Sequence, residues 1–334
     1  MVKYDVFLRE DRTRRLVVRK NLLVGTFAIC AMILTACANK QLEAAKVAVD
    51  TYNTEAAAFN EKIKPYNDAV AGVEAANEAL DGEISDVQEL INKGETPYDP
   101  ETLTGLKDSL SSAVAAKVSV PEKLDEYEMI EIQEGMKKAD LEALTQKVLA
   151  DTDEIKEFAV PQNPEVPDYS ETVAALQKAK QTYLDSVTSL QQVTAPSDAF
   201  VIERLQSIDT ILAIDAVTED HDPNGKLNKQ GGYIGCIYFS DEQVDKSKLY
   251  IDPSKNKDDV IDVGTIGGGA VEIFANVEDA EKRDVYLGSF DGTILSNGSH
   301  YIVGTCVVRT SEELTGTQQK ELTEQITQAL IEVK

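Results

Sequence analysis

Residues 42–91 read LEAAKVAVDTYNTEAAAFNEKIKPYNDAVAGVEAANEALDGEISDVQELI. In this stretch, side chains that are apolar except at Asn77 recur at alternating intervals of three and four residues. They are Leu42, Ala45, Val49, Tyr52, Ala56, Phe59, Ile63, Tyr66, Val70, Val73, Asn77, Leu80, Ile84, Val87 and Ile91. Such heptads predict long helices with coiled-coil-like packing. Pro65 lies inside the pattern without shifting it, so we expect a kink or a short break there.

The heptads leave two architectures open. One is an extended stalk, and the other is a bundle in which the helix packs against later segments of the chain. We favour the bundle, because further helical segments follow directly. Together with the C-terminal region described below, the pattern predicts a mainly α protein with a C-terminal α+β module.

A short apolar run precedes the heptads. It extends from Leu22 to Ala36 after a basic N-terminus, and it ends in Leu34-Thr35-Ala36-Cys37. A run of this length is short for a membrane span, which needs about 20 residues, and the layout is that of a secretory signal with small residues at its cleavage site. The last four residues resemble the lipobox of bacterial lipoproteins. The resemblance implies cleavage after Ala36 and acylation of Cys37, with palmitate-type chains as the membrane anchor. We therefore predict a signal peptide over residues 1–36 and a mature chain on the extracellular face of the cell membrane.

Clusters of Gly and Pro divide the rest of the helical region. We predict a coiled-coil-like helical region over 37–159, a Pro-rich linker over 160–169 and a helical hairpin over 170–217, whose second helix begins after Ser197. Residues 118–137 are acidic and read as irregular or weakly helical. The segment from Leu80 to about Lys117 resembles the FIVAR-type helical repeat of Gram-positive surface proteins.

The character of the chain changes at residue 218, where glycines become frequent. We predict a small α+β domain over 218–334 in the order β-β-α-β-α. Its strands are expected at Tyr233–Phe239, Ala270–Phe274 and Tyr301–Val308. Its helices are expected after the N-cap residues Asn276 and Thr315, which have capping-box partners at Asp279 and Gln318.

One motif in this domain is specific. Residues 222–233 read DPNGKLNKQGGY, and the chain later carries Val271–Phe274, Glu278–Arg283 and Val307–Arg309. These stretches resemble the C-terminal module of uncharacterised lipoproteins and surface proteins of Gram-positive bacteria, some of which are labelled extracellular-matrix-binding. The resemblance implies a place in the cell envelope, and it brings no catalytic residues.

Two sets of residues are candidates for binding or cross-linking. Asp220, Asp222 and Asn224, followed by Gly225, match the first half of a calcium loop. The twelfth position, however, is Gly231 where a glutamate belongs, so a structural turn is favoured and calcium is the only cofactor that the sequence suggests.

Cys236 and Cys306 lie in strand-like surroundings and could form a disulfide if their strands are neighbours; the alternative is two buried thiols. The two histidines and these cysteines lack metal-ligand spacing, so we predict no metal site.

The overall charge limits the possible partners. The chain has 59 acidic and 33 basic residues and a net charge of −26, which excludes nucleic acid as a partner. The sequence contains no nucleophile elbow and no HExxH motif, so we expect no enzyme. We predict a lipid-anchored envelope protein with a binding or assembly role toward an unknown envelope or extracellular protein or polymer. The alternatives are a module for a small ligand or calcium, and a hydrolase of cell-wall or glycan material.

Overall fold

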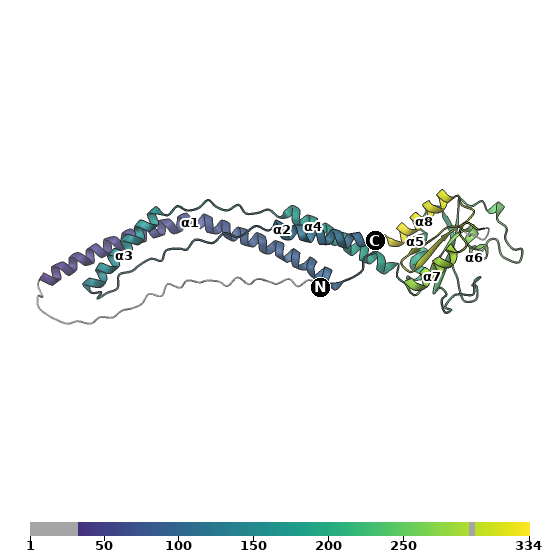
Figure 1. The fold of residues 1–334 in the computed structure, drawn as a ribbon, viewed down its shortest axis with the longest axis horizontal. Helices are drawn as coiled ribbons and strands as arrows, with labels where there is room; N and C mark the ends of the chain where they lie inside the picture. Colours follow the sequence, from purple (N-terminus) through teal and green to yellow (C-terminus); the bar gives the residue numbers. More distant parts are fainter. Residues whose placement is uncertain (1–32, 294–297) are drawn as a thin grey trace. The chain divides into compact units, whose positions relative to one another are not determined.

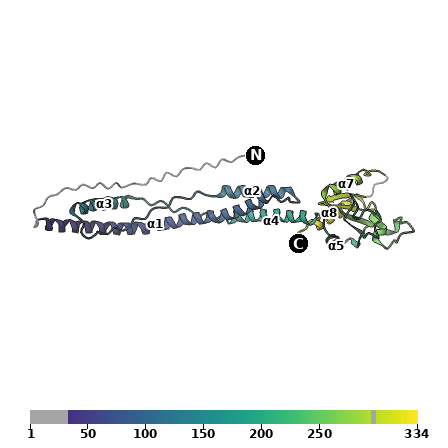
Figure 2. The same cartoon turned by 90° about the horizontal axis from the view of Figure 1, so that it is seen from below.

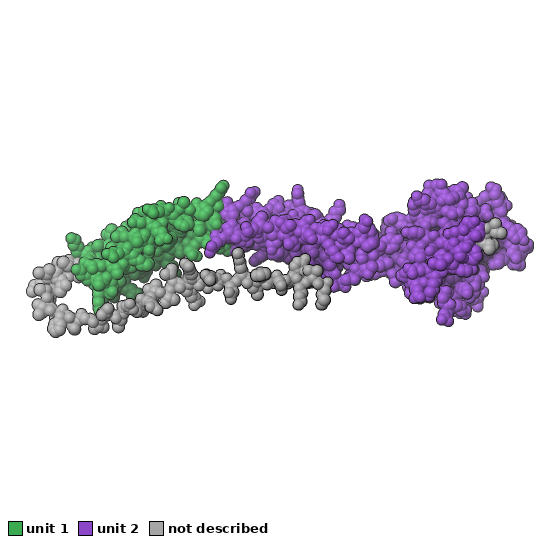
Figure 3. Space-filling view, in the orientation of Figure 1, with its two compact units in different colours: residues 1–67, 123–162 green, residues 68–122, 163–334 purple. Residues whose placement is uncertain are grey.

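The computed structural model describes the backbone of residues 33–293 and 298–334, and it describes side chains from residue 40 onward (Figure 1). The predicted signal peptide, residues 1–36, lies almost wholly outside this range. The chain forms two compact units, coloured separately in Figure 3. Unit 1 combines the chain up to Asn67 with Lys123–Gln162, and unit 2 combines Asp68–Glu122 with Asn163–Lys334.

Helix α1 (Ile33–Lys93) confirms the heptad prediction. Every heptad position from Ala45 to Leu80 is buried, including the polar Asn77. The helix continues through Pro65, so of the two expected outcomes, a kink or a short break, the break is absent. Pro65 lies on the exposed side of the helix, where the carbonyl group that loses its hydrogen bond can be hydrated.

In unit 1, α1 packs against α3 (Lys138–Glu157) and against an irregular segment that precedes α3. Figures 1 and 2 both show α3 alongside the first part of α1. The apolar core contains Phe59, which makes edge-to-face contacts with Tyr127 and Phe158 at 5.1 and 5.4 Å between ring centroids. The acidic stretch 118–137, predicted to be irregular or weakly helical, is irregular over most of its length.

Three asparagines of α1 hold this segment by its backbone. The amides of Asn53, Asn60 and Asn67 each donate to the carbonyl oxygen, and accept from the N–H, of one residue of the segment. These residues are Ile130, Tyr127 and Leu124, respectively, and the six distances lie between 2.8 and 2.9 Å. The segment therefore runs antiparallel to α1, with every third residue paired to a side-chain amide.

The spacing of the asparagines determines the conformation of the segment. Seven residues of α-helix rise by about 10.5 Å. Three residues of the segment must cover the same distance, which is about 3.5 Å per residue and close to the limit of a fully extended chain. Exposure follows the same period of three, because Leu124, Tyr127 and Ile130 are half-buried while the two residues between each pair are exposed.

The helical part of unit 2 contains the second part of α1 with α2 (Pro100–Ala116) and α4 (Ser170–Gln192). Asn77 repeats the amide contact here, donating to Val118 O at 2.8 Å while its Oδ1 accepts from the Tyr169 hydroxyl at 2.7 Å. Residues 158–169, which include the predicted Pro-rich linker, form neither helix nor strand.

The C-terminal part of unit 2 is a five-stranded antiparallel sheet in the order β1-β2-β3-β5-β4. The bounds of the strands are β1 Ile211–Ala216, β2 Gly235–Asp241, β3 Gly268–Ile273, β4 His300–Val303 and β5 Cys306–Thr310. Helices α5 (Asp198–Leu205) and α8 (Gly316–Ile331) contribute to the core on one face. Helices α6 (Val260–Val263) and α7 (Val277–Gly288) contribute to the core on the other face. Short 3-10 helices lie at Lys246–Lys248 and Gly264–Gly267.

Two predictions for this region are wrong. The helix expected from Ser197 to Val217 ends at Leu205, and residues 211–216 form the edge strand β1, where Ile214 pairs with Phe239 of β2. The single strand expected over Tyr301–Val308 is the hairpin β4–β5. Gly304 turns this hairpin with a positive φ of 62°, and a Cβ atom there would lie 2.4 Å from Val193 O. Strand β1 thus forms through its pairing with β2, which lies more than twenty residues further along the chain.

No helix in the described part of the chain is long and apolar enough to cross a membrane.

Replacing Asn60 by aspartate tests the contact between α1 and the extended segment. The shape and the acceptor are retained, but the N–H donor to Tyr127 O is lost and a carboxylate oxygen faces that carbonyl group. We expect Asn60→Asp to lower the free energy of unfolding of unit 1 by about 1–3 kcal/mol, because a half-buried carbonyl oxygen loses its partner. Urea denaturation measures this change, and hydrogen exchange at the Tyr127 amide should accelerate.

Asn92→Asp is the matched control. Asn92 is exposed near the end of the same helix, and its side chain only accepts from Gln88 Nε2 at 3.1 Å. Its substitution should change stability by less than about 0.5 kcal/mol. Equal effects of the two substitutions would contradict a specific role for the Asn60 amide.

Candidate functional site

Two of the motif stretches meet on one face of the sheet. Residues 222–233 follow β1 and lead into β2, and helix α7 follows β3. Leu227 and Tyr233 from the first stretch share a hydrophobic core with Ala280 and Leu287 of α7. Because both stretches are anchored in this core, their polar side chains form the rim of a common cavity, which is the candidate functional site.

Asp222 shapes the first stretch. Its carboxylate accepts from the backbone amides of Asn224, Lys226 and Leu227, at 3.0, 2.5 and 2.8 Å, and from the hydroxyl of Tyr233. Burial raises the pKa of Asp222, but these hydrogen bonds outweigh burial, so its pKa lies below the ordinary value. The carboxylate therefore stabilises the turn at neutral pH, and this contribution is lost as the pH falls through the lowered pKa.

These contacts bear on the two interpretations of the predicted calcium loop. Both oxygens of Asp222 already accept from the protein, and the amide group of Asn224 donates to the Tyr238 hydroxyl at 3.1 Å. In the described part of the chain, neither Asp220 nor Asp222 belongs to a converging group of three His, Cys, Asp or Glu side chains. The hydrogen bonds of Asp222 and Asn224 therefore favour the structural turn over a calcium loop.

The close packing of the turn also explains one of its glycines. A Cβ atom at Gly232 would lie 2.1 Å from the carbonyl oxygen of Lys226, so a larger residue would displace the loop. The following residue, Tyr233, is buried, and burial together with its hydrogen bond to Asp222 raises the pKa of its hydroxyl. Tyr233 therefore stays a hydrogen-bond donor at neutral pH.

A buried ion triad supports the other side of the cavity. Glu272 of β3 is fully buried and accepts from Arg283 of α7 through Nε and Nη2, at 2.6 and 2.7 Å. Arg309 of β5 donates its Nη1 to the same carboxylate at 3.0 Å. Two cations thus share one buried anion, and the bidentate pair fixes the position of Arg283 at the cavity. Sequence analysis missed this triad, because Glu272, Arg283 and Arg309 come together only through the sheet and α7.

The cavity between these stretches has a volume of about 430 Å³. Its lining consists of Asn224, Lys226, Gly231, Gly232, Tyr233, Phe274, Lys282, Arg283 and Tyr286. Three of these residues are cationic and none is acidic. The size falls within the usual range of small-molecule sites, and the three aromatic rings provide apolar walls.

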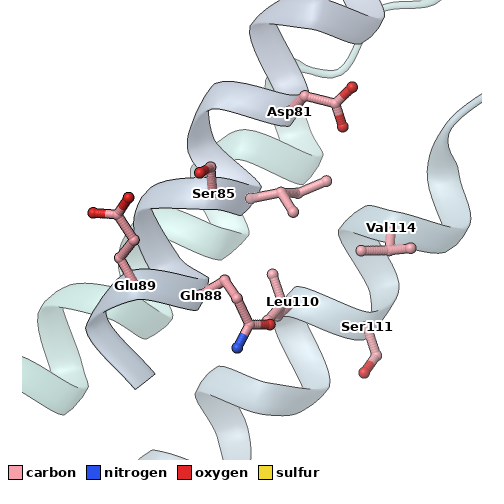
Figure 4. Close-up of a pocket in the computed structure, with 8 residues that line it drawn as sticks. Asp81, Ser85, Gln88, Glu89, Leu110, Ser111 and Val114 are labelled. Atoms are coloured by element: carbon pink, nitrogen blue, oxygen red, sulfur yellow. The ribbon is translucent and has the colours of Figure 1, made fainter. Parts of the chain in front are cut away.

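The other cavities have a different character. A larger one of about 810 Å³ lies beside residues 246–260 and has both lysines and aspartates in its lining. In the helical part of unit 2, a shallow pocket of about 540 Å³ lies between α1 and α2. Figure 4 shows polar side chains such as Asp81 and Gln88 around Leu110 and Val114 there.

The cysteines do not form a disulfide. Cys236 on β2 and Cys306 on β5 are free and buried, and β3 lies between their strands. They also belong to cores on opposite faces of the sheet. Burial raises the pKa of the Cys306 thiol to about 12, and it raises the pKa of Cys236 well above the ordinary value. Both residues therefore behave as small apolar side chains.

Replacing Glu272 by glutamine tests the ion triad. The substitution leaves Arg283 and Arg309 without their common anion, which is costly for buried charges. We expect Glu272→Gln to lower the free energy of unfolding by about 3 kcal/mol or more. Thermal and urea denaturation measure the loss. Glu281→Gln, on the exposed side of α7, is the control and should stay within about 0.5 kcal/mol of the unchanged protein. A Glu272→Gln protein as stable as this control would contradict a stabilising triad.

No protein-family model, curated protein or solved structure matches the chain. The resemblances noted in the sequence therefore stay predictions. The function has to be argued from the residues of the site.

Proposed function

We propose that this chain is a lipid-anchored protein of the cell envelope whose C-terminal module binds a small phosphate-bearing ligand without catalysing a reaction. The ligand would occupy the cavity between residues 222–233 and α7. The observation that carries the proposal is the charge of the lining, because Lys226, Lys282 and Arg283 reach this cavity and no acidic side chain lines it. In a chain with a net charge of −26, a locally cationic cavity favours an anion at that place.

The three cations contribute differently. Arg283 is fixed by Glu272, and Lys282 pairs with Glu278 of its own helix at 2.8 Å. Lys226 has no ion-pair partner among the residues that the structure describes, so its charge is available to a ligand. Lysine binds phosphate as a flexible point charge, which suits a residue at the rim of an open cavity.

The polar groups of the site support binding in preference to catalysis. Asp222, Asn224 and Arg283 each make hydrogen bonds that hold the walls of the cavity in place. The aromatic rings of Tyr233, Phe274 and Tyr286 supply the contact area around an anion. A site with fixed walls and an unpaired lysine is suited to recognition.

The proposed anchor rests on Leu34-Thr35-Ala36-Cys37. The backbone of these residues lies in the first turns of α1, which begins at Ile33, and their side chains are outside the described range. Cleavage before Cys37 would shorten α1 by four residues and leave the heptads intact. The helical region would then begin directly at the acylated residue. We propose an extracellular location on the cell membrane on this basis.

The lipid anchor is tested by metabolic labelling with a fatty-acid analogue, followed by cell fractionation. We expect Cys37→Ala to abolish labelling and to leave the protein in the medium or as an uncleaved precursor. Cys236→Ala is the control, because Cys236 is buried in the module and should not affect labelling. A Cys37→Ala protein that is still processed and membrane-bound would rule out the proposed anchor.

The binding site is tested by calorimetry with glycerol phosphate, using glycerol as the uncharged comparison. We expect binding of glycerol phosphate only, with an affinity that falls as salt is added. Lys226→Gln should weaken binding about tenfold or more, because one charge-assisted hydrogen bond is lost. Lys229→Gln, in the same loop but outside the cavity lining, should bind like the unchanged protein. Unchanged affinity in Lys226→Gln, or equal binding of glycerol, would overturn the proposed site.

A further inference from the structure

Three side chains that the proposed binding site does not use lie together beside it. His221 belongs to the turn after β1 and directly precedes Asp222. Asp259 is the N-cap residue of α6, and Asp262 lies in the first turn of that helix. His221 is therefore about forty residues away from the two aspartates along the chain, and only the fold brings them together.

The potential ligand atoms of these residues converge. His221 Nε2 lies 3.2 Å from Asp262 Oδ1, and His221 Nδ1 lies 3.9 Å from Asp259 Oδ2. One ligand atom from each residue lies within 4.8 Å of the other two, which no other group of three His, Cys, Asp or Glu residues achieves in the described part of the chain. All three side chains are partly exposed, so an ion from solution can reach them.

The second oxygen of each carboxylate is already fixed by the backbone. Asp259 Oδ1 accepts from the amides of Ile261 and Asp262, at 2.9 and 3.3 Å. Asp262 Oδ2 accepts from the amide of Asn256 at 2.9 Å. The remaining oxygens, Asp259 Oδ2 and Asp262 Oδ1, therefore face the imidazole ring. Outer hydrogen bonds that orient the ligands in this way are typical of metal sites in proteins.

We propose that His221, Asp259 and Asp262 bind one divalent transition-metal ion of the zinc type. One imidazole nitrogen and two carboxylate oxygens form a ligand set that such ions accept, and the sites of hard cations such as Ca²⁺ use oxygen ligands instead. Three protein ligands leave a coordination position for water. Lys255 Nζ lies 3.6 Å from Asp262 Oδ1. A bound ion would displace this ammonium group from the oxygen.

The ion would link two segments that are far apart in the sequence. His221 adjoins the turn that Asp222 organises, and Asp262 holds the segment around Asn256. Bound metal would therefore stabilise the loops on this side of the sheet. This inference is independent of the proposed phosphate site, since the two use different side chains.

Equilibrium dialysis of the full chain in detergent against ZnCl₂ tests the site, with excess Mg²⁺ present to occupy surface carboxylates. We expect His221→Ala to bind one Zn²⁺ fewer per chain than the unchanged protein. Zinc should raise the melting temperature of the unchanged protein and leave that of His221→Ala unaffected. Among the described residues, the ring of His221 has hydrogen-bond and ion-pair partners only in the two aspartates, so its removal should leave the fold intact.

His300→Ala is the matched control. His300 also contacts two aspartates, with Asp284 2.6 Å from Nδ1 and Asp291 3.3 Å from Nε2, but these three residues do not form a converging group. This variant should bind as much zinc as the unchanged protein. Equal zinc content in His221→Ala and the unchanged protein would overturn the proposal, and so would an equal loss in both histidine variants.

Discussion

The helical region depends on one kind of hydrogen bond, in which the side-chain amide of an asparagine on α1 pairs with the backbone of an extended segment. An extended chain that packs on a helix has no neighbouring strand to satisfy its N–H and C=O groups. Asn53, Asn60 and Asn67 supply both partners at every third residue, and they hold the segment against the heptad face of the helix. The segment can therefore contribute Leu124, Tyr127 and Ile130 to the core without forming a helix of its own.

The C-terminal module satisfies its buried polar groups in a different way. Its sheet pairs backbone with backbone, so the side chains of the central strand are free for other contacts. Glu272 uses this freedom to bind Arg283 and Arg309, and Asp222 performs a comparable role for the turn before β2. In both cases one carboxylate gathers several donors and thereby fixes a wall of the cationic cavity. The shape of the cavity thus depends on two acidic residues that do not line it.

The features that could be predicted from sequence are those that depend on near neighbours. The heptads predict the long helix that the structure shows as α1. The capping residues Asn276 and Thr315 predicted the starts of α7 and α8, and the structure confirms both. A mainly α chain with a C-terminal α+β region follows from these local signals.

What could not be predicted depends on residues that are distant in sequence. Strand β1 forms because β2 offers it a partner, and the ion triad needs three elements. The cluster at His221 likewise joins the turn after β1 to helix α6. One long-range contact did leave a signal that was overlooked. An aromatic residue precedes each of the three asparagines that hold the extended segment, in Tyr52-Asn53, Phe59-Asn60 and Tyr66-Asn67. This pair of residues therefore recurs with a period of seven. On the partner segment, half-buried apolar residues recur with a period of three.

The backbone pairing on α1 also has an evolutionary consequence. The hydrogen bonds of these asparagines to the segment go to main-chain atoms, so this pairing does not require particular side chains on the segment. Of every three residues in that segment, two are exposed, and they include Asp125, Glu126 and Glu128. Mutations at these positions can change the surface charge of the protein while the amide pairing and the core contacts persist. The segment is thus a region in which selection can adjust surface chemistry independently of the fold.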